Sequence, residues 1–577
     1  MRQKLRHPAP SADRLATRRR LISEGKHPYP PALQPTHTLG QLRRLYGELP
    51  ADTTTGDSVV LVGRVMAHRS HGGMGFVDLR DGTDDIQLLL TDGAPETQPV
   101  YTDWQTDVDL GDQVSVSGEI VTSRTGALSI RVDGWMLASK ALRPLPSAPG
   151  HGRGSTRTQR PSGGDQLPSY QRMMVDRREG ARARGRASVL RALREELYTA
   201  GYLEADTPLL HALPGGTARP FVTWMNAWGV PVFLRGNTEL YLKRLVVGGA
   251  ERVFELGRVF RNEGTGAMHH PEFTVCEGYA AHTDYRDSAE LVERLVRAAA
   301  SVLHEAEGPS RITSAVLGGA DDRPHRPAAG TARHGMGAPG ETGRAPGETG
   351  GGDPTGGLRA PDSPLAATGP MPFARVTLRQ LLSEHLKAPI TSVTSTETFL
   401  QHARRHGLDV ADDTTASALS LLLFRKLVRP TLTQPTFVFD FPTRAARFAR
   451  PRPGDPTLVE AWSLVLAGTD IGQGCTELTD PVEQRRRMTE QRREPGLEHL
   501  PLDEEFLTAV EHGLPPLGGF SLGVDRLLGA LRDDGRRLSD QQCLGLERAG
   551  TATSEQTGRD APPEQTADQE TDRVEVS

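Results

Sequence analysis

The chain has 577 residues, of which 36% are hydrophobic and 5% aromatic, and its formal net charge is −5. This length allows two or three domains with substantial cores, while the low apolar content predicts that part of the chain is unstructured. The net charge excludes a chain-wide nucleic-acid-binding surface, so any such contact requires local basic patches.

Cysteine usage and hydropathy narrow the class of protein further. The three cysteines, Cys276, Cys475 and Cys543, form no CxxC pair, which argues against a disulfide framework or a structural zinc site. No apolar run approaches the roughly 20 residues that cross a bilayer, and the N-terminus lacks the apolar core of a signal peptide. We therefore expect a soluble, cytoplasmic protein that makes no membrane contact.

Residues 1–57 form an arm that is first basic and then rich in proline. Its early cations include Arg2, Lys4 and Arg6. Two interpretations fit this composition: an arm that contacts nucleic-acid phosphates, and a solvated segment that binds nothing.

Residues 58–146 contain five short β-rich runs separated by turns that carry glycine, a pattern typical of an OB-fold barrel. Such barrels bind single-stranded nucleic acid by stacking bases on aromatic side chains in a basic groove. The candidates for these contacts are Arg64, Arg69, Phe76 and Gln87. Each of them could also be an ordinary core or surface residue of a barrel.

A linker rich in Gly, Ser, Arg and Pro, at 147–167, separates the barrel from a second domain whose first part we place at 168–304. Apolar residues between Val189 and Leu197 recur at helical spacing, and Gly201 ends this helix before a strand.

The stretch from Arg252 to Tyr279 predicts an antiparallel hairpin with a polar bend. Arg261 ends the first strand, and its planar fork suits phosphate or carboxylate oxygens. Phe273 offers a flat face on which a purine could stack. Glu277 and Tyr279 alternate along the second strand, so both should point to the same side of the sheet.

The composition changes after a predicted helix between Asp287 and Leu303. Residues 305–370 are dominated by Gly, Pro and Ala and repeat the sequence APGETG, so we expect a disordered insertion. The second domain resumes at 371–540, and the acidic tail at 541–577 is again expected to be disordered.

Two motifs resemble one protein family. FRNE, a short loop and HHPEFT, from Phe260 to Thr274, resemble motif 2 of class II aminoacyl-tRNA synthetases in the lysyl-tRNA synthetase version, which reads FRNE, loop, HNPEFT. GLPPLGGFSLGVDRL, from Gly513 to Leu527, resembles motif 3. The resemblance implies an α+β fold, with an N-terminal OB-fold β-barrel and a class II catalytic domain built on an antiparallel sheet flanked by helices. The segment that ends at Pro208 resembles motif 1, which implies a homodimer.

The resemblance assigns the ATP site residue by residue. Arg261 and Arg526 are the implied catalytic arginines. Arg261 would contact the α-phosphate and the substrate carboxylate, and Arg526 would contact the γ-phosphate. Glu263, His269 and Phe273 would complete the ATP site around adenine.

In the implied amino-acid site, acidic side chains would bind the ammonium groups of the substrate. LPGGTARPF places Gly216 beside the substrate, and ELYLKR assigns Glu239 to its α-amino group. Lys243 stands four residues after Glu239 on a predicted short helix, where the two side chains are neighbours. Glu277 with Tyr279 would meet the ε-ammonium of L-lysine, a charge-assisted arrangement.

Two further assignments concern metal and tRNA. Asp470 and Glu477 fall on the family's two Mg2+-binding glutamates and are hard oxygen donors. They stand seven residues apart, and the GQG between them could provide a turn that brings them together. Glu119 falls where the family has a glutamate near the tRNA anticodon.

Several substitutions cluster in the implied pocket. Asp470 replaces a glutamate, whereas Gln473, Cys475 and Thr479 replace Asn, Phe and Asn, and His270 replaces Asn. They are compatible with weaker activity, a lysine analogue as substrate, or a paralogue that no longer charges tRNA.

The chain thus resembles a divergent bacterial lysyl-tRNA synthetase, an enzyme that forms lysyl-adenylate from ATP and L-lysine and passes the lysine to tRNA. One alternative is a ligase that adenylates lysine or an analogue for a different acceptor. The other is a non-catalytic tRNA-binding paralogue.

Overall fold

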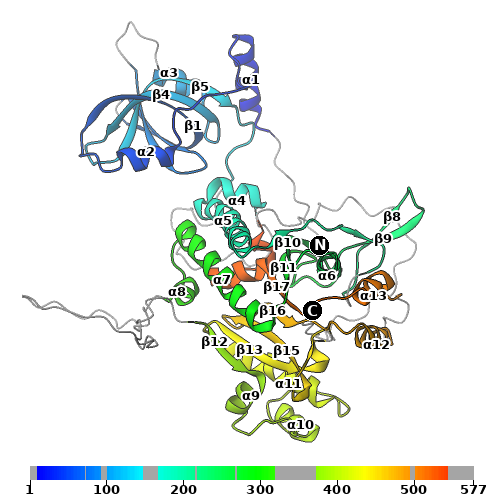
Figure 1. Ribbon diagram of the computed structural model, residues 1–577. Helices are drawn as coiled ribbons and strands as arrows, with labels where there is room; N and C mark the ends of the chain where they lie inside the picture. Colours follow the sequence, from blue (N-terminus) through cyan, green and yellow to red (C-terminus); the bar gives the residue numbers. More distant parts are fainter. Residues whose placement is uncertain are drawn as a thin grey trace, which may run out of the picture. The chain divides into compact units, whose positions relative to one another are not determined.

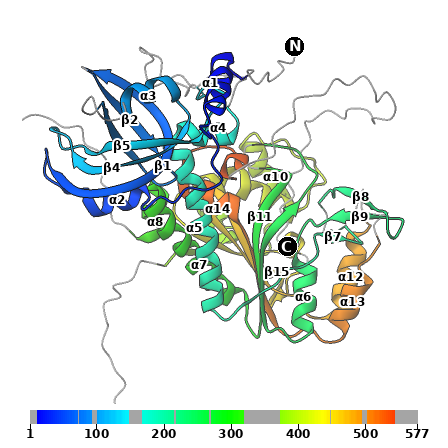
Figure 2. The ribbon, with the colours of Figure 1, turned by 90° about the horizontal axis from the view of Figure 1, so that it is seen from above.

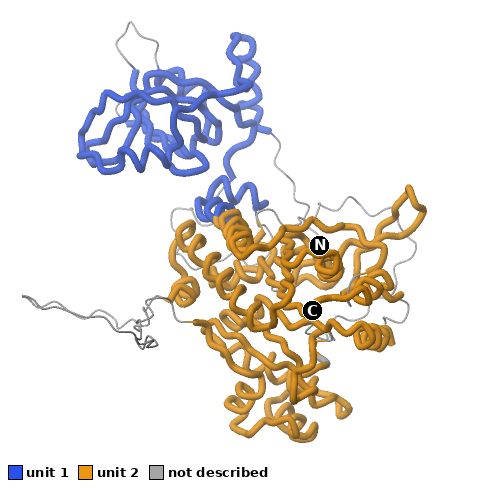
Figure 3. Tube along the Cα trace, viewed as in Figure 1, with its two compact units in different colours: residues 1–184, 543–567 blue, residues 185–542, 568–577 orange. Residues whose placement is uncertain are grey.

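The computed structural model describes residues 10–71, 73–92, 100–146, 167–214, 218–266, 269–318, 372–446, 448–493 and 501–542. They form two compact units, which divide between Arg184 and Gly185 (Figure 3). Most of the predicted linker, most of the predicted insertion and nearly all of the predicted acidic tail, at 147–166, 319–370 and 543–577, lie outside the described residues. Within the described ranges, no helix combines the length and the apolar character needed to cross a membrane.

The first unit is built around a closed barrel with strand order β1-β2-β3-β5-β4. Every second side chain along its strands is buried, as for Leu61, Val65 and Leu79, because successive strand residues point to opposite faces. This arrangement confirms the predicted OB-fold barrel. The elements of the first unit are α1 (Ala12–Ser23), α2 (Leu39–Tyr46), β1 (Thr54–His71), β2 (Met74–Arg80), β3 (Asp85–Thr91), α3 (Val100–Asp107), β4 (Gln113–Thr122), β5 (Leu128–Ser139) and α4 (Ser169–Val175).

Helices α1 and α2 belong to the predicted N-terminal arm, and both pack on the barrel. Leu21 of α1 is 1% exposed and joins the barrel core. The guanidinium of Arg14 donates to the carbonyl oxygens of Leu110 at 2.9 Å and Arg143 at 3.1 Å. The described part of the arm is therefore an ordered part of the first unit.

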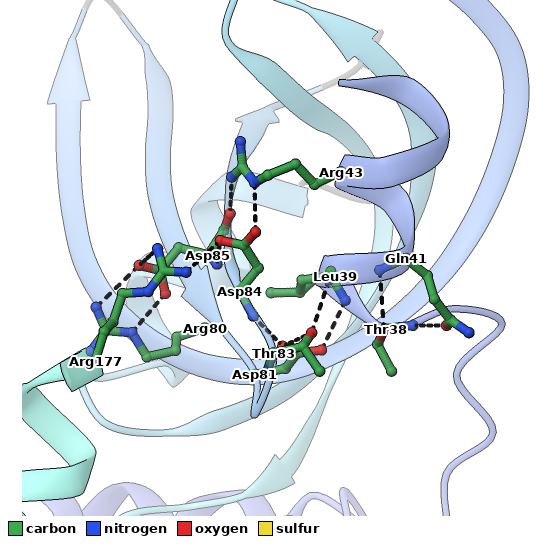
Figure 4. Close-up of polar contacts among 11 residues, drawn as sticks. Thr38, Leu39, Gln41, Arg43, Arg80, Asp81, Thr83, Asp84, Asp85 and Arg177 are labelled. Atoms are coloured by element: carbon green, nitrogen blue, oxygen red, sulfur yellow. Dashed lines mark hydrogen bonds and ion pairs between the residues drawn. The ribbon is translucent and has the colours of Figure 1, made fainter. Parts of the chain in front are cut away.

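An acidic turn between β2 and β3 gathers three arginines (Figure 4). Arg43 of α2 donates to Asp84 at 2.7 Å, and Arg80 donates to Asp85 at 2.6 Å. Arg177, at the start of α5 (Arg177–Thr199), also donates to Asp84 at 2.7 Å. Each exposed pair contributes only roughly 0–1 kcal/mol. Together they hold α2 and the first turn of α5 against the same turn of the barrel.

The second unit is organised around a mixed sheet with strand order β12-β13-β15-β16-β17-β11-β10-β6, with β14 paired to β15 outside this path (Figure 1). The strands from β13 to β10 pair antiparallel, whereas β12 and β6 are parallel to their neighbours. The predicted antiparallel sheet is thus confirmed at its centre, while both edges are parallel. A separate small sheet has the order β7-β9-β8.

The strands of the second unit are β6 (Leu203–Glu204), β7 (Leu210–His211), β8 (Val222–Met225), β9 (Val230–Leu234), β10 (Arg252–Phe260), β11 (Glu272–Ala281), β12 (Ala374–Thr377), β13 (Thr436–Pro442), β14 (Pro451–Arg452), β15 (Asp455–Leu466), β16 (Thr469–Thr476) and β17 (Leu517–Gly523). Its helices after α5 are α6 (Glu239–Val247), α7 (Tyr285–Glu307), α8 (Arg311–Leu317), α9 (Leu378–Leu386), α10 (Thr396–Arg405), α11 (Ala416–Leu423), α12 (Pro481–Gln491), α13 (Glu504–Glu511) and α14 (Val524–Arg532).

Helices cover both faces of the central sheet (Figure 2). On one face, α5, α7, α8 and α14 enclose a core in which Leu295, Trp462 and Leu527 are fully buried. The helices α6 and α9 to α13 form the apolar clusters of the other face, which include Tyr279 and Cys475. The predicted hairpin is confirmed, since β10 and β11 pair antiparallel.

Helix α8 lies inside the region predicted as a disordered insertion, so that prediction was wrong at its N-terminal boundary. Ser310 caps α8 by accepting a hydrogen bond from Thr313 N, and Ile312 and Val316, four residues apart, are buried in the core. This short apolar pair provides enough burial, against α7 and α14, to order a segment whose overall composition is poor in apolar residues. The catalytic-domain fold therefore continues to Gly318.

Candidate active site

A row of polar side chains crosses one face of the central sheet. Residues directly opposite each other on neighbouring strands point to the same face. From β10 to β15, the row consists of Glu255, Glu277, Ser521, Gln473 and Ser463. This row is polar, whereas other positions on the same face, such as Tyr279 and Cys475, belong to apolar clusters.

Glu277, in the middle of this row, is 4% exposed and receives hydrogen bonds from two elements. Its Oε2 accepts from Thr238 N at 3.0 Å and from the Thr238 hydroxyl, and its Oε1 accepts from Ser521 Oγ at 3.1 Å. Burial raises the pKa of Glu277, although the Thr238 hydrogen bonds oppose this shift. Tyr279 is buried on the same side of β11, as predicted, and burial raises the pKa of its phenol.

The ammonium of Lys243 lies between two buried carboxylates. Its Nζ donates to Glu239 Oε1 at 2.5 Å and to Glu477 Oε2 at 2.6 Å. The rings of Tyr279 and Phe448 flank it, with their centroids 5.4 and 5.8 Å from Nζ. The structure confirms the predicted closeness of Glu239 and Lys243, and it adds a contact with the predicted metal ligand Glu477.

The electrostatics of this cluster favour a protonated lysine. Burial opposes the charged form of Lys243, but the Glu239 and Glu477 carboxylates raise its pKa above the usual value. Burial also raises the pKa of Glu477 to about 7, against the opposing effect of the Lys243 ammonium. The thiol of Cys475 donates to Glu477 Oε1 at 3.2 Å. Within the described residues, no cation is paired with Glu277. The cluster therefore holds three buried carboxyl groups and one ammonium, which contacts two of them.

Gly519 of β17 leaves room for this cluster. It lies opposite Tyr279 on one side and Cys475 on the other. A Cβ atom at this position would lie 2.5 Å from the Tyr279 ring and closer still to Glu477 Oε1. Any side chain at position 519 would therefore displace both groups.

The implied adenine residues lie at the loop end of the β10–β11 hairpin. The guanidinium of Arg261 lies over the Phe273 ring, 5.5 Å from its centroid, and its Nε donates to Gly236 O at 3.4 Å. Glu263 and His269 are exposed in the loop that connects the two strands. These four residues are thus neighbours in one structural element, while their contacts with ATP stay predictions.

Arg526 approaches the same strand end from a different element. It lies in the first turn of α14, three residues after Gly523, which pairs with Val275 of β11. A Cβ atom at Gly523 would lie 3.7 Å from the Arg526 side chain. Arg261 and Arg526 thus come from separate elements, and the guanidinium of each is a group that can bind the oxygens of a nucleotide.

The two implied metal ligands lie on one strand. Asp470 is the second residue of β16, and Glu477 follows its last residue. Gly472 to Gly474 pair as strand residues on both sides, so the expected turn between the two carboxylates is not formed. The assignment of Asp470 and Glu477 as Mg2+ ligands stays a prediction.

Each of the two carboxylates already has a cationic partner. Asp470 forms an ion pair with Arg429 and accepts a 2.9 Å hydrogen bond from Ser463 Oγ, whereas Glu477 is paired with Lys243. No group of three potential metal-ligating side chains occurs in the described part of the chain. Gly216, the remaining implied substrate residue, lies outside the described residues.

On the barrel, three of the predicted nucleic-acid-binding residues lie in one row across the outer face. The register places Arg69, Phe76, Leu89, Arg131 and Glu119 side by side on β1, β2, β3, β5 and β4. An aromatic ring next to two arginines fits the stacking and phosphate contacts of single-stranded nucleic acid.

Gln87 and Arg64 occupy different places relative to that row. Gln87 lies two residues from Leu89 on β3 and therefore extends the row on the same face. Arg64 does not join it, because its guanidinium donates to the carbonyl of Gly111 at 2.7 Å. The sequence prediction missed Arg131, which is ion-paired with Glu119 and whose alternation with buried neighbours on β5 was the available signal.

The chain matches two family models. Residues 169–535 match the model described as tRNA synthetases class II (D, K and N), and residues 59–138 match the OB-fold nucleic acid binding domain.

Individual relatives cover most of the chain. It is 37% identical over 525 residues to the lysine–tRNA ligase of Mycolicibacterium gilvum, covering 90% of this chain and 93% of that protein. It is 35% identical over 525 residues to the lysine–tRNA ligase of Mycobacterium bovis, covering 89% and 92%. It is 36% identical over 520 residues to the lysylphosphatidylglycerol biosynthesis bifunctional protein LysX of Mycobacterium tuberculosis, covering 88% of this chain but 39% of that longer protein.

Proposed function

Because the chain belongs to the class II tRNA synthetases of the D, K and N type, we propose that it joins L-lysine to tRNA through a lysyl-adenylate. The observation that carries the choice of amino acid is the buried cluster of Glu239, Glu277 and Glu477, in which the described residues place a single ammonium, that of Lys243.

The charge of this cluster supports a substrate with two ammonium groups. A buried carboxylate without a cation is costly, and the raised pKa of Glu277 reflects that cost. Lysine would bring its α-ammonium to Glu239 and its ε-ammonium to Glu277 with Tyr279. Glu277 accepts three hydrogen bonds, from Thr238 N, Thr238 Oγ1 and Ser521, which leaves about one acceptor position for a ligand.

The first step is an in-line transfer of adenylate. A carboxylate oxygen of lysine attacks the α-phosphorus of ATP, and the bond to the β-phosphate oxygen breaks to release pyrophosphate. Arg261 would hold the substrate carboxylate against the α-phosphate, and Arg526 would hold the γ-phosphate. Position and charge are the main contributions that a protein can make to such a transfer.

In the second step, a ribose hydroxyl at the 3′ end of tRNA attacks the lysyl carbonyl carbon, and AMP leaves. The barrel row that contains Arg69, Phe76 and Glu119 would bind the tRNA anticodon. Class II synthetases generally use ATP with Mg2+, and Asp470 and Glu477 are the residues that would hold this ion, which would screen the charge of the triphosphate. A homodimer is part of the proposal, from the resemblance to motif 1.

A second candidate function has one observation in its favour. The 36% identity to the LysX protein, whose name places it in lysylphosphatidylglycerol biosynthesis, is close to the identity to the ligases. Together with Gln473 and Cys475 in the pocket, it supports a ligase that activates lysine or an analogue for an acceptor other than protein-synthesis tRNA.

Lysine-dependent exchange of pyrophosphate into ATP, followed by charging of total tRNA, tests the proposal. We expect exchange with L-lysine and formation of acid-precipitable lysyl-tRNA. Exchange with a lysine analogue alone, or exchange without charging, would favour the second candidate. Absence of exchange with any amino acid, from protein that binds tRNA, would favour a binding paralogue.

A further inference from the structure

A closed polar cluster lies behind the proposed ATP site and joins three elements of the second unit. Arg186 of α5 donates from Nη1 to Asp525 Oδ1 at 2.5 Å and from Nη2 to Thr274 Oγ1 at 2.8 Å. Thr274 N in turn donates to Asp525 Oδ2 at 2.7 Å. Arg186, Thr274 and Asp525 are 5%, 5% and 1% exposed. A buried network whose members satisfy each other holds its elements rigidly.

The cluster is adjacent in sequence to both ends of the proposed nucleotide site. Thr274 follows Phe273, and Asp525 precedes Arg526. Because side chains alternate along a strand, the Thr274 side chain points to the face opposite Phe273. The cluster therefore does not reach ATP itself, but it ties the strand that carries Phe273 to the helix that carries Arg526.

We propose that Arg186 is a positioning residue for ATP, which sets the separation between Phe273 and Arg526 by holding Asp525 against Thr274. The proposal rests on the proposed function for the identity of the nucleotide. Phe273 would stack on adenine and Arg526 would hold the γ-phosphate, so one ATP molecule must contact both residues at the same time. Fixing that spacing in advance removes an ordering cost from binding.

Helix α5 can bring Arg186 to this buried cluster because Gly185 allows the helix to pack closely against α7. A Cβ atom at position 185 would lie 3.0 Å from the Leu303 side chain and closer still to Glu307 Oε1. Glu307, at the end of α7, accepts in turn from Arg532 of α14 at 3.0 Å. The helix that carries Arg186 is thus held against both helices behind the site.

Two conservative variants test the proposal in the full chain. Thr274→Val keeps the size of the side chain but removes the hydroxyl that accepts from Arg186. Arg186→Lys keeps the charge but loses the fork that donates to Asp525, Thr274 and the carbonyl of Gln541. In lysine-dependent pyrophosphate exchange, we expect each variant to raise the KM for ATP about tenfold, which corresponds to 1.4 kcal/mol. The KM for lysine should stay within about twofold of wild type.

The matched control is Arg194→Met on the same helix. Arg194 donates to Glu204 at 2.8 Å, and its side chain is 36% exposed. This variant should leave both KM values unchanged. A merely structural role of Arg186 would lower the amount of active enzyme, or raise both KM values together, and either result would overturn the proposal. So would an unchanged KM for ATP in a variant with a wild-type melting curve. If Arg186→Lys does not fold, Thr274→Val decides, since it removes only one hydrogen bond.

Binding of Mg-ATP alone, by equilibrium dialysis, separates this proposal from the proposed function. If wild type shows no exchange but binds ATP, the proposed function fails, and roughly tenfold weaker binding by the two variants still supports the positioning role. If wild type does not bind ATP, the positioning role for ATP is overturned as well.

Discussion

Lys243 joins two carboxylates that the proposed amino-acid site presents to its substrate. Its side chain is 3% exposed, as are those of Glu239 and Glu477. Water cannot stabilise charges at that depth, so each member of the group depends on the others. At the scale of single residues, the stability of the site and its affinity for cations therefore have the same origin.

Replacing Lys243 with methionine would leave Glu239 and Glu477 facing each other without a cation. We expect Lys243→Met to lower the free energy of unfolding by about 3–5 kcal/mol, the cost of breaking a buried ion pair. Urea denaturation measures this change.

The exposed pair between Arg485 and Glu504 supplies the control, since its side chains are 39% and 62% exposed. Arg485→Met should change the free energy of unfolding far less than Lys243→Met does, because water screens exposed charges. Equal losses in the Lys243 and Arg485 variants would show that burial does not determine the strength of the Lys243 contacts.

Glu277 should make stability depend on pH in a defined direction. Burial raises its pKa above the usual 4.5, so the folded protein holds this proton more tightly than the unfolded chain does. The stabilising effect of the protonated form is complete at low pH and is lost as pH rises through the folded pKa. Glu277→Gln is neutral throughout, so its stability relative to wild type should increase as the pH rises from 4.5 through the folded pKa of Glu277.

Thermal unfolding across that pH range tests the expectation. L-lysine should raise the melting temperature of wild type but not that of Glu277→Gln, because the variant lacks the anion that would bind the ε-ammonium. A stability difference between the two proteins that does not change with pH would contradict the role of burial at Glu277.

At the scale of elements, the antiparallel register of β11, β17 and β16 brings the site together. It places Tyr279, Gly519 and Cys475 side by side, one row away from Glu277 and Ser521. Helix α6 then lies over these strands with Lys243 on its inner face. The site thus needs a strand with no side chain at position 519.

Gly519→Ala should disrupt this arrangement, because its Cβ would meet the Tyr279 ring at 2.5 Å. We expect a loss of about 1–3 kcal/mol in stability, as for other overpacked sites, together with a higher KM for lysine. Gly523→Ala on the same strand is the control for stability, since the atom nearest to its added Cβ, Ile471 O, would lie 3.5 Å away and its φ is −75°. Similar destabilisation by both changes would argue against the close packing at Gly519.

At the scale of the whole molecule, two units divide the proposed work. The first contains the barrel row, and the second contains the buried carboxylates and the two arginines. With a net charge of −5, the chain as a whole does not attract a polyanion, so the tRNA contact should depend on a few exposed cations.

The double change Arg69→Ala and Arg131→Ala should therefore weaken tRNA binding without affecting activation of lysine. We expect a higher KM for tRNA. The slope of the logarithm of the binding constant against the logarithm of the salt concentration should become shallower by about 1 for each lost phosphate contact. Pyrophosphate exchange in the absence of tRNA should be unchanged. Arg404→Ala, at a side chain of the second unit that is 51% exposed, is the matched charge control. Equal effects of the barrel and control changes on tRNA binding would contradict the role of the row.

Local patterns in the sequence determined the barrel, the β10–β11 hairpin, the shared side of Glu277 and Tyr279, and the neighbouring positions of Glu239 and Lys243. Each of these depends on spacing within one or two elements, because the period of a strand or helix sets which side chains lie together. The same short-range patterns failed to predict α8, which is ordered because it packs against α7 and α14.

Only the tertiary structure decided which distant charges meet. Lys243 pairs with Glu477, 234 positions away, and Arg186 pairs with Asp525, 339 positions away. Asp470 pairs with Arg429, which stands 41 positions before it in the chain. Sequence motifs specify which charges a site contains, but strand order and burial select their partners, because a buried charge must find its counter-charge within hydrogen-bonding distance.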